Sequence, residues 1–147
     1  MKIALICSDG GHLTQMHLIL ESFQGHNVFF VTYNNVRTRK LTHQKYLINV
    51  IGTNPIKMSI AFLTFFKIFL KERPDIVVTT GAELAIPAFY IAKLLGAKTI
   101  FIESWSRVKT NSGTGRIVYP VADIFLVQWP HLLKIYGKKA QYQGSVI

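Results

Sequence analysis

Short apolar segments alternate along the chain with longer segments in which apolar residues recur at helical spacing. The apolar segments predict β-strands covered on both faces, because a strand with one wet face would alternate apolar and polar residues. The other segments predict helices with one apolar face. Strands are predicted at residues 2–7, 27–32, 46–51, 75–80, 98–102, 123–127 and 140–142, and helices at residues 12–23, 57–72, 82–95, 129–136 and within 115–122.

The regular alternation of strands and helices indicates the class of fold. It predicts right-handed βαβ units, and therefore an α/β fold with a doubly wound, mostly parallel, Rossmann-like sheet. The helix at 57–72 is expected to end at Arg73 and Pro74, because the residue before a proline disfavours the helical conformation. The polar stretches 34–45 and 104–114 are expected to be long loops.

Polar residues gather at the expected carboxyl ends of the strands. Ligands of a doubly wound sheet bind beyond this edge. Residues 8–12, 79–83 and 103–107 each follow a predicted strand, and Gln128 follows another. We therefore expect these segments, which are far apart in the sequence, to form the functional site together.

The first of these segments contains a glycine pair followed by a histidine, Gly10, Gly11 and His12. Two glycines allow a sharp turn and a close approach of the backbone to a ligand. The helix that follows presents unpaired N–H groups and a partial positive charge, which suit a phosphate or pyrophosphate. His12 could take up a proton near neutral pH. The alternative is an ordinary strand-to-helix turn with a solvated histidine.

The next two segments add hydroxyl and charged groups to the same edge. Thr80 and Gly81 make a second corner that suits an oxyanion, although a threonine that merely caps a helix is common. Glu103 could orient a hydroxyl or a catalytic base, Ser104 lies beside it, and Arg107 could bind a phosphate through two hydrogen bonds. The alternative for Glu103 and Arg107 is a structural ion pair at four-residue spacing.

The predicted helix at 57–72 has an apolar arc that is wider than a sheet requires, with basic residues at its flanks. Such a pattern is typical of shallow insertion into an anionic membrane surface. The alternative is a buried core helix. The residues expected to contact the membrane are Met58, Phe62, Phe65, Phe66, Phe69, Lys67 and Lys71.

Composition supports a partner that is both apolar and negatively charged. Half of the 147 residues are hydrophobic, and 17 Lys and Arg against 7 Asp and Glu give a net charge of +10. An anionic membrane surface or a phosphorylated lipid meets both properties, whereas nucleic acid meets only the charge, and no nucleic-acid-binding motif is present. The length predicts a single domain over residues 1–147.

Other classes of site and location are excluded or disfavoured. Cys7 is the single cysteine, which excludes a disulfide framework and a cysteine-based zinc site. The histidines show no metal-ligand spacing, so neither a metal nor a cofactor is expected. No apolar run reaches the roughly 20 residues of a membrane-spanning helix. A peripheral position on the cytoplasmic face of the membrane is therefore expected.

Taken in this order, the Gly-Gly-His turn, the Thr-Gly strand end and the Glu-Ser-x-x-Arg segment resemble the acceptor-binding, N-terminal half of a GT-B glycosyltransferase. The closest resemblance is to the Alg14-type family of oligosaccharide and polysaccharide biosynthesis. It covers essentially the whole chain. A more distant likeness is to the N-terminal domain of the single-chain transferase that completes the peptidoglycan lipid precursor.

The resemblance implies a membrane-associated subunit that holds a lipid-pyrophosphate-linked sugar acceptor. A separate small chain of GT-B type would bind the nucleotide sugar, with UDP-GlcNAc as the expected kind of donor, and only the complex would transfer a hexosyl or N-acetylhexosaminyl group. His12 would be the base or an acceptor-orienting group, Glu103 would support it, and Gly10 and Gly11 would admit the pyrophosphate. Residues 143–147 lie about where a one-chain enzyme would cross into its second domain.

Two features depart from the family pattern. Asp9 stands where a small residue usually precedes the glycine pair, and an acidic group beside a diphosphate is unfavourable unless it points away or pairs with a cation. The N-terminal membrane anchor of eukaryotic members is also missing. This favours a prokaryotic relative attached peripherally through residues 57–72.

Three alternatives remain open at the level of sequence. The chain could be a non-catalytic membrane scaffold that activates a glycosyltransferase. It could use its charge to bind nucleic acid. It could also be a self-contained nucleotide-binding enzyme, which stabilisation by a nucleotide would reveal.

Overall fold

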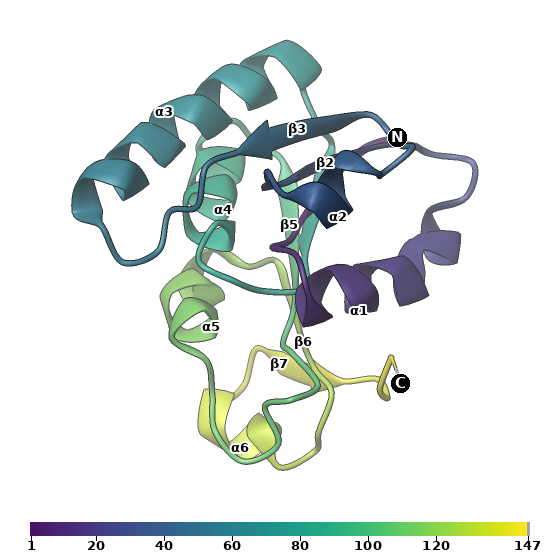
Figure 1. Ribbon diagram of the computed structural model, residues 1–147. Coiled ribbons are helices and arrows are strands. Elements are labelled where there is room, and N and C mark those ends of the chain that lie inside the picture. Colours follow the sequence, from purple (N-terminus) through teal and green to yellow (C-terminus); the bar gives the residue numbers. More distant parts are fainter. Residues whose placement is uncertain (147) are drawn as a thin grey trace.

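The computed structural model describes residues 1–146, and a parallel sheet forms its centre (Figure 1). The strand order is β3-β2-β1-β4-β5-β6-β7, and all six pairings are parallel. The predicted doubly wound sheet is therefore confirmed, and Ile147 lies outside the described residues. The strands are β1 (Lys2–Ile6), β2 (Asn27–Tyr33), β3 (Lys45–Ile48), β4 (Ile76–Thr79), β5 (Lys98–Ile102), β6 (Ile124–Val127) and β7 (Ala140–Tyr142).

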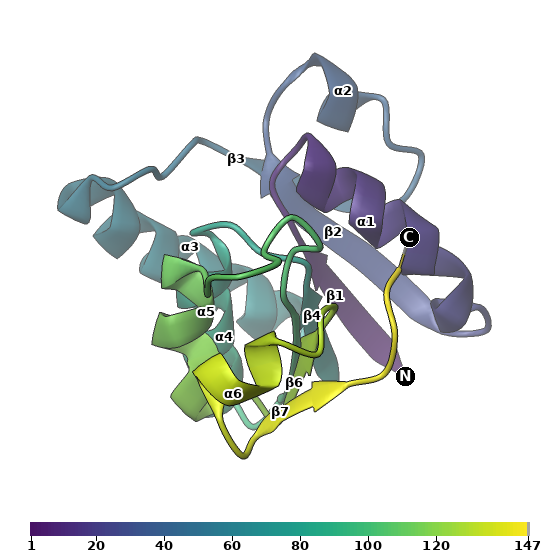
Figure 2. The same cartoon turned by 90° about the horizontal axis from the view of Figure 1, so that it is seen from below.

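Helices cover the two faces of the sheet unequally. Figure 2 shows α1 on one side of the sheet and α3, α4, α5 and α6 on the other. The two hydrophobic clusters of the core follow this division, because Leu5 belongs to the same cluster as Leu13 of α1, whereas Ile6 belongs to the same cluster as Phe65 of α3. The helices are α1 (Gly11–Ile19), α2 (Val36–Arg39), α3 (Pro55–Glu72), α4 (Ala85–Leu94), α5 (Gly113–Val118) and α6 (Leu132–Tyr136), with 3₁₀ turns η1 (Leu20–Phe23) and η2 (Tyr119–Val121).

Several element boundaries differ from the sequence prediction for local reasons. The predicted helix at 12–23 changes to 3₁₀ geometry at Leu20. The predicted loop at 34–45 contains α2, because Asn35 and Thr38 cap each other's backbone N–H groups in a reciprocal box. The strand predicted at 46–51 is shorter and ends at Ile48.

Helix α3 begins and ends at clear signals. The side chain of Asn54 accepts hydrogen bonds from the N–H groups of Ile56 and Lys57, and Pro55 fills the first helical position. Arg73 adopts a left-handed conformation with φ of 50°, directly before Pro74. The predicted end of the helix is therefore confirmed.

The face that α3 buries corrects the predicted membrane contact. Phe65 and Phe69 are 0% and 1% exposed, and they lie in the core against the sheet. Met58, Phe62 and Phe66 are half-buried against the same cluster. The aromatic arc packs inward because burying a large aromatic side chain contributes about 1.5–3 kcal/mol.

The opposite face of α3 is the exposed one, and it also carries apolar side chains. Ile56, Ile60, Leu63 and Leu70 are between 48% and 71% exposed. Lys57, Lys67 and Lys71 are exposed beside them. This surface of α3, these four apolar and three basic residues, is called the α3 stripe below. No helix among residues 1–146 has the length and apolar character needed to span a membrane.

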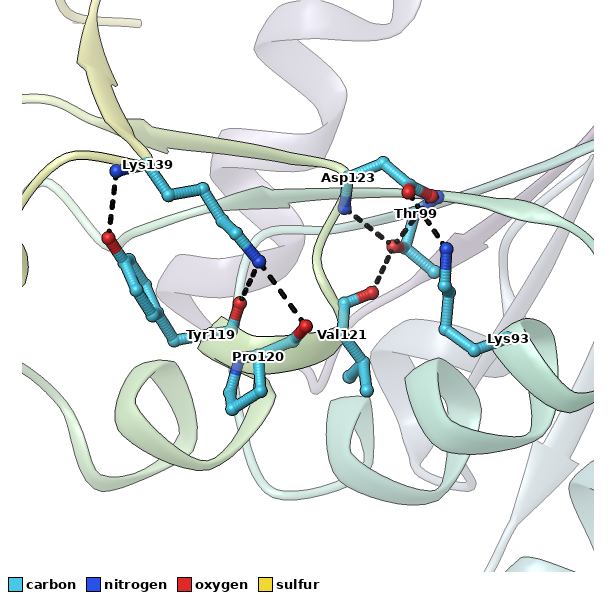
Figure 3. Close-up of polar contacts among 7 residues, drawn as sticks. All are labelled: Lys93, Thr99, Tyr119, Pro120, Val121, Asp123 and Lys139. Atoms are coloured by element: carbon cyan, nitrogen blue, oxygen red, sulfur yellow. Dashed lines mark hydrogen bonds and ion pairs between the residues drawn. The ribbon is translucent and has the colours of Figure 1, made fainter.

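Polar contacts fix the amino ends of β5 and β6, at the edge opposite the predicted site (Figure 3). Asp123 accepts hydrogen bonds from the Thr99 N–H at 2.9 Å and from Lys93 Nζ at 2.8 Å. Burial opposes ionisation of Asp123, but these donors outweigh it and hold the pKa of the carboxyl below its usual range. Nearby, Lys139 Nζ donates to the carbonyl of Tyr119 at 2.7 Å.

Candidate functional site

A polar cavity of about 350 Å³ opens at the carboxyl edge of the sheet. It receives residues from the loops after β1, β4 and β5, as the sequence predicts. Five predicted site residues line it: His12, Gly81, Glu103, Ser104 and Arg107. The other lining residues are Ala82, Glu83, Ser106, Ser112, Gly113 and Thr114.

His12 is held in one orientation by the loop after β4. Its Nδ1 lies 2.9 Å from the carbonyl oxygen of Thr80. A carbonyl only accepts hydrogen bonds, so Nδ1 carries the proton in the neutral ring. The lone pair is then on Nε2, the nitrogen that could accept a proton from a ligand.

Thr80 differs from its predicted role. Its side chain is fully buried, and its hydroxyl donates to the carbonyl of His12 at 2.7 Å. Thr80 therefore contacts His12 through both its hydroxyl and its carbonyl, and it is not among the residues that line the cavity. It positions the histidine instead of binding a phosphate, and it does not cap α4.

Gly81 and Ala82 form a strained turn beneath His12. Both have positive φ, 122° and 78°, and this is unusual for alanine. A Cβ on Gly81 would lie 2.8 Å from Cε1 of His12, so only glycine leaves room for the imidazole. Strain of this kind persists where the surrounding structure fixes the backbone, and it is common at functional sites.

The glycine turn leads into the N-terminus of α1, next to the cavity. Gly10 has φ of 71°, and no side chain caps the N–H groups of the first turn of α1. Arg37 donates to the carbonyl of Gly10 at 3.2 Å and to Thr14 Oγ1 at 2.9 Å. Gly10 and Gly11 are exposed. They do not line the cavity themselves, but they directly precede His12, which does.

The carboxylate of Glu103 is fully occupied by hydrogen bonds. It is 1% exposed; Oε1 accepts from the Ser104 N–H, and Oε2 accepts from the N–H and hydroxyl of Ser112 and from the Tyr136 hydroxyl. Burial, and then the neighbouring Glu103 carboxylate, raise the pKa of Tyr136. Gly115 must be glycine here, because a Cβ would lie 2.2 Å from the Tyr136 hydroxyl oxygen. Glu103 thus anchors the loop that forms one wall of the cavity.

Two glutamines that lie deeper in the structure connect the same loops. Gln15 Oε1 accepts from the Trp105 N–H at 3.1 Å and from Gln128 Nε2 at 2.7 Å. Gln128 also donates to the carbonyl of Glu103 at 2.9 Å. The position of Gln128 at the strand end was visible in the sequence, but the role of Gln15, one turn after His12, depends on contacts distant in sequence.

Arg107 contributes an unpaired cation to the cavity. Within residues 1–146 its guanidinium forms no ion pair, so the alternative of a Glu103–Arg107 pair is not realised. Asp9 is exposed and forms no ion pair in this part of the chain either. The same residues contain no cluster of three His, Cys, Asp or Glu that could hold a metal ion. The cavity thus combines a potential base, a free cation and several hydroxyl groups.

Solved structures share this fold at low sequence identity. MurG of Acinetobacter baumannii superposes with a TM-score of 0.80 and 18% identity over 97% of this chain. The UDP-N-acetylglucosamine 2-epimerase of Rickettsia bellii gives a TM-score of 0.80 with 13% identity over 99% of this chain. In both comparisons the chain covers 45% of the solved protein. The fold is thus a Rossmann-like domain of the kind found in GT-B glycosyltransferases and these epimerases.

Curated relatives are more similar in sequence. The UDP-N-acetylglucosamine transferase subunit ALG14 of Yarrowia lipolytica is 29% identical over 88% of this chain and 60% of its own length. The subunit of the same name from Homo sapiens is 34% identical over 56% of this chain and 40% of its own length. The family model described as oligosaccharide biosynthesis protein Alg14 like matches residues 32–146. The match spans β3 to β7 and includes the loops after β4 and β5 that line the cavity, so the chain belongs to the family of Alg14-like oligosaccharide biosynthesis proteins.

Proposed function

We propose that the chain is the acceptor-binding subunit of a two-chain glycosyltransferase that makes a lipid-linked oligosaccharide or polysaccharide. One observation carries the proposal: the cavity joins an oriented imidazole with a free Nε2 to an unpaired Arg107 beside the uncapped start of α1. The relatives named as UDP-N-acetylglucosamine transferase subunits support a partner chain and a UDP-GlcNAc-type donor.

The acceptor is a sugar linked to a lipid through pyrophosphate. The pyrophosphate would lie at the first turn of α1, where Gly10 and Gly11 give access to free N–H groups and the helix dipole favours negative charge. Arg107 and the Ser104 hydroxyl would bind its remaining oxygens from the loop after β5. This arrangement directs the sugar toward His12.

His12 would act as the general base of transfer. Its Nε2 takes the proton of the attacking acceptor hydroxyl as the new bond forms between that oxygen and the anomeric carbon of the donor sugar. The bond between the anomeric carbon and the nucleoside diphosphate breaks. The nucleoside diphosphate is the leaving group and stays bound to the partner chain. Thr80 keeps Nε2 available, and Glu103 positions the loop that carries Ser104 and Arg107.

The α3 stripe would attach the subunit to an anionic membrane surface, peripherally and on the cytoplasmic face. Its exposed apolar residues could insert shallowly while its lysines contact lipid phosphates. This replaces the aromatic arc expected from the sequence, which is buried. The net charge of +10 acts in the same direction.

Reconstitution with the partner tests the catalytic proposal. The tagged chain is purified with the small protein that accompanies it, and transfer from UDP-GlcNAc to a lipid-pyrophosphate sugar is measured for wild type and His12→Gln. We expect kcat to fall about 10²- to 10⁴-fold, the usual contribution of a general base. His131→Gln, which changes an exposed histidine that directly precedes α6 and does not line the cavity, is the matched control. Full activity of His12→Gln would contradict catalysis by this chain and favour a scaffold.

A further inference from the structure

A second cavity, of about 260 Å³, lies between α1 and the segment that contains and follows α2. Figure 2 shows these two elements as neighbours at the edge of the molecule. Four basic side chains line this cavity: His17, Arg37, Lys40 and His43. Leu13, Leu41 and Thr42 complete the lining, which contains no acidic residue.

The basic groups of this cavity have no anionic partner in the described part of the chain. The two ion pairs found among residues 1–146 lie elsewhere. The imidazoles of His17 and His43 both contact the ring of Phe30, with centroids 6.2 and 5.5 Å away, and neither makes a hydrogen bond within residues 1–146. Arg37 is fixed beside them by its bonds to Gly10 and Thr14.

Burial and like charges in the same cavity both disfavour the charged form of His17. Desolvation of its ring, and then the charges of Arg37 and His43, lower the pKa of His17. Asp9 precedes the glycine turn and Glu21 lies one helical turn after His17, but both are exposed and neither lines the cavity. A bound anion would relieve the repulsion and stabilise the charged imidazole.

We propose that this cavity binds a phosphate group, either free phosphate or the phosphate of an anionic lipid headgroup. The Thr42 hydroxyl and the four basic side chains supply donors, and Leu13 and Leu41 provide apolar surface beneath them. The site is separate from the sugar-transfer cavity, because the two share no lining residue. It does not depend on the proposed transferase activity.

Ring signals of His17 and His43, followed by NMR, test the site directly. Inorganic phosphate and sulfate are titrated in turn, and sulfate is included because it keeps its charge between about pH 5 and 8, where histidine titrates. We expect saturable shifts at both rings and a higher pKa of His17 with the anion bound. Lys40→Ala should weaken binding about tenfold, the usual loss for one hydrogen bond to a charged group, and Lys138→Ala, which removes an equal charge elsewhere, should not.

Vesicles distinguish the two sources of phosphate. Sedimentation is measured with phosphatidylcholine vesicles that contain or lack phosphatidylglycerol. If the headgroup is the ligand, Lys40→Ala and His43→Gln lose binding to the anionic vesicles relative to Lys138→Ala. If free phosphate is the ligand, Lys40→Ala, His43→Gln and Lys138→Ala bind the anionic vesicles equally well, and the soluble ions still give saturable shifts of the His17 and His43 ring signals. The proposal is overturned if neither ion saturates the ring shifts and the pocket variants match Lys138→Ala on vesicles.

Discussion

At the scale of single residues, the cavity depends on small groups that make room for a few larger ones. Thr80 holds His12 through two hydrogen bonds, one from its carbonyl oxygen to the imidazole and one from its hydroxyl to the His12 backbone carbonyl. Gly81 leaves the space that the ring occupies. On the other side of the cavity, Gly115 does the same for the contact between Tyr136 and Glu103. The chemistry assigned to His12 therefore depends on residues that take no chemical part in the proposed reaction themselves.

Replacing Gly81 tests this dependence. Gly81→Ala should lower the free energy of unfolding by about 1–3 kcal/mol, because alanine is strained at a φ of 122° and its Cβ would displace the imidazole. Activity of the reconstituted complex should fall as well. Urea unfolding and transfer assays measure the two effects.

Gly113→Ala is the control for stability, because a Cβ on Gly113 meets no atom within 4 Å. An equal loss of stability in the two variants would contradict the proposed clash. A Gly81→Ala chain that keeps full activity would show that His12 need not occupy its present position.

The sequence predicts the residues that line the cavity better than those that support it. His12, Glu103 and Arg107 follow strands, and the topology of a parallel sheet brings strand ends together. The contacts of Tyr136 and Gln15 with these loops join residues 33 and 90 positions apart. No local pattern records such a contact, so these residues were missed.

At the scale of elements, α3 shows why a helical wheel does not fix which face is buried. The wheel gives an apolar arc and a basic stripe, but Ile60 lies within the stripe, and Ile56, Leu63 and Leu70 are exposed as well. Both faces are apolar enough to be buried. The bulkier aromatic face packs on the sheet, which leaves the aliphatic residues outside.

Paired substitutions on α3 separate its two faces. Leu63→Glu should abolish binding to anionic vesicles with little change in stability, because Leu63 is 63% exposed. Phe65→Ala should cost about 3–5 kcal/mol of unfolding free energy, because it empties a fully buried site. Vesicle sedimentation and urea unfolding measure the two outcomes. Unchanged membrane binding of Leu63→Glu would contradict the role of the α3 stripe.

The C-terminal end of α3 carries a second, electrostatic connection. Glu72 is buried, pairs with Lys2 of β1 and accepts hydrogen bonds from Tyr46 and Gln44. The Lys2 ammonium and then the Tyr46 hydroxyl hold the pKa of Glu72 below its usual range. Burial and the same carboxylate raise the pKa of Tyr46 to about 12.

This connection predicts how stability depends on pH. A carboxyl with a lowered pKa in the folded state stabilises the fold above its unfolded pKa of about 4.3. That contribution is lost as the pH falls through the lower folded pKa. Wild type should therefore lose stability below about pH 5 more steeply than Glu72→Gln, which should be less stable at neutral pH by about 1–3 kcal/mol. Urea unfolding gives the free energy of unfolding of each protein at each pH. If that free energy changed with pH in parallel for the two proteins, this account would be contradicted.

At the scale of the whole molecule, the unpaired polar groups of the site lie at the carboxyl edge of the sheet, beside satisfied groups such as Glu103. The amino edge holds satisfied contacts such as that of Asp123 with Lys93 and Thr99. The carboxyl edge holds the unpaired Arg107 and the free Nε2 of His12. The parallel sheet and the location of the cavity at its carboxyl edge followed from the sequence because both are consequences of βαβ topology. The orientation of α3 and the short helix α2 did not, because packing and a capping box decide them.

The central claim is that this chain alone recognises the pyrophosphate-linked acceptor. Calorimetric titration of the chain with a short-chain isoprenyl-pyrophosphate sugar tests it most directly. A separate titration with UDP-GlcNAc provides the comparison. We predict saturable binding of the acceptor, about tenfold weaker for Arg107→Ala than for Lys138→Ala, and no binding of UDP-GlcNAc without the partner. Tight binding of UDP-GlcNAc together with no binding of the acceptor would contradict the account and indicate a self-contained nucleotide-binding enzyme.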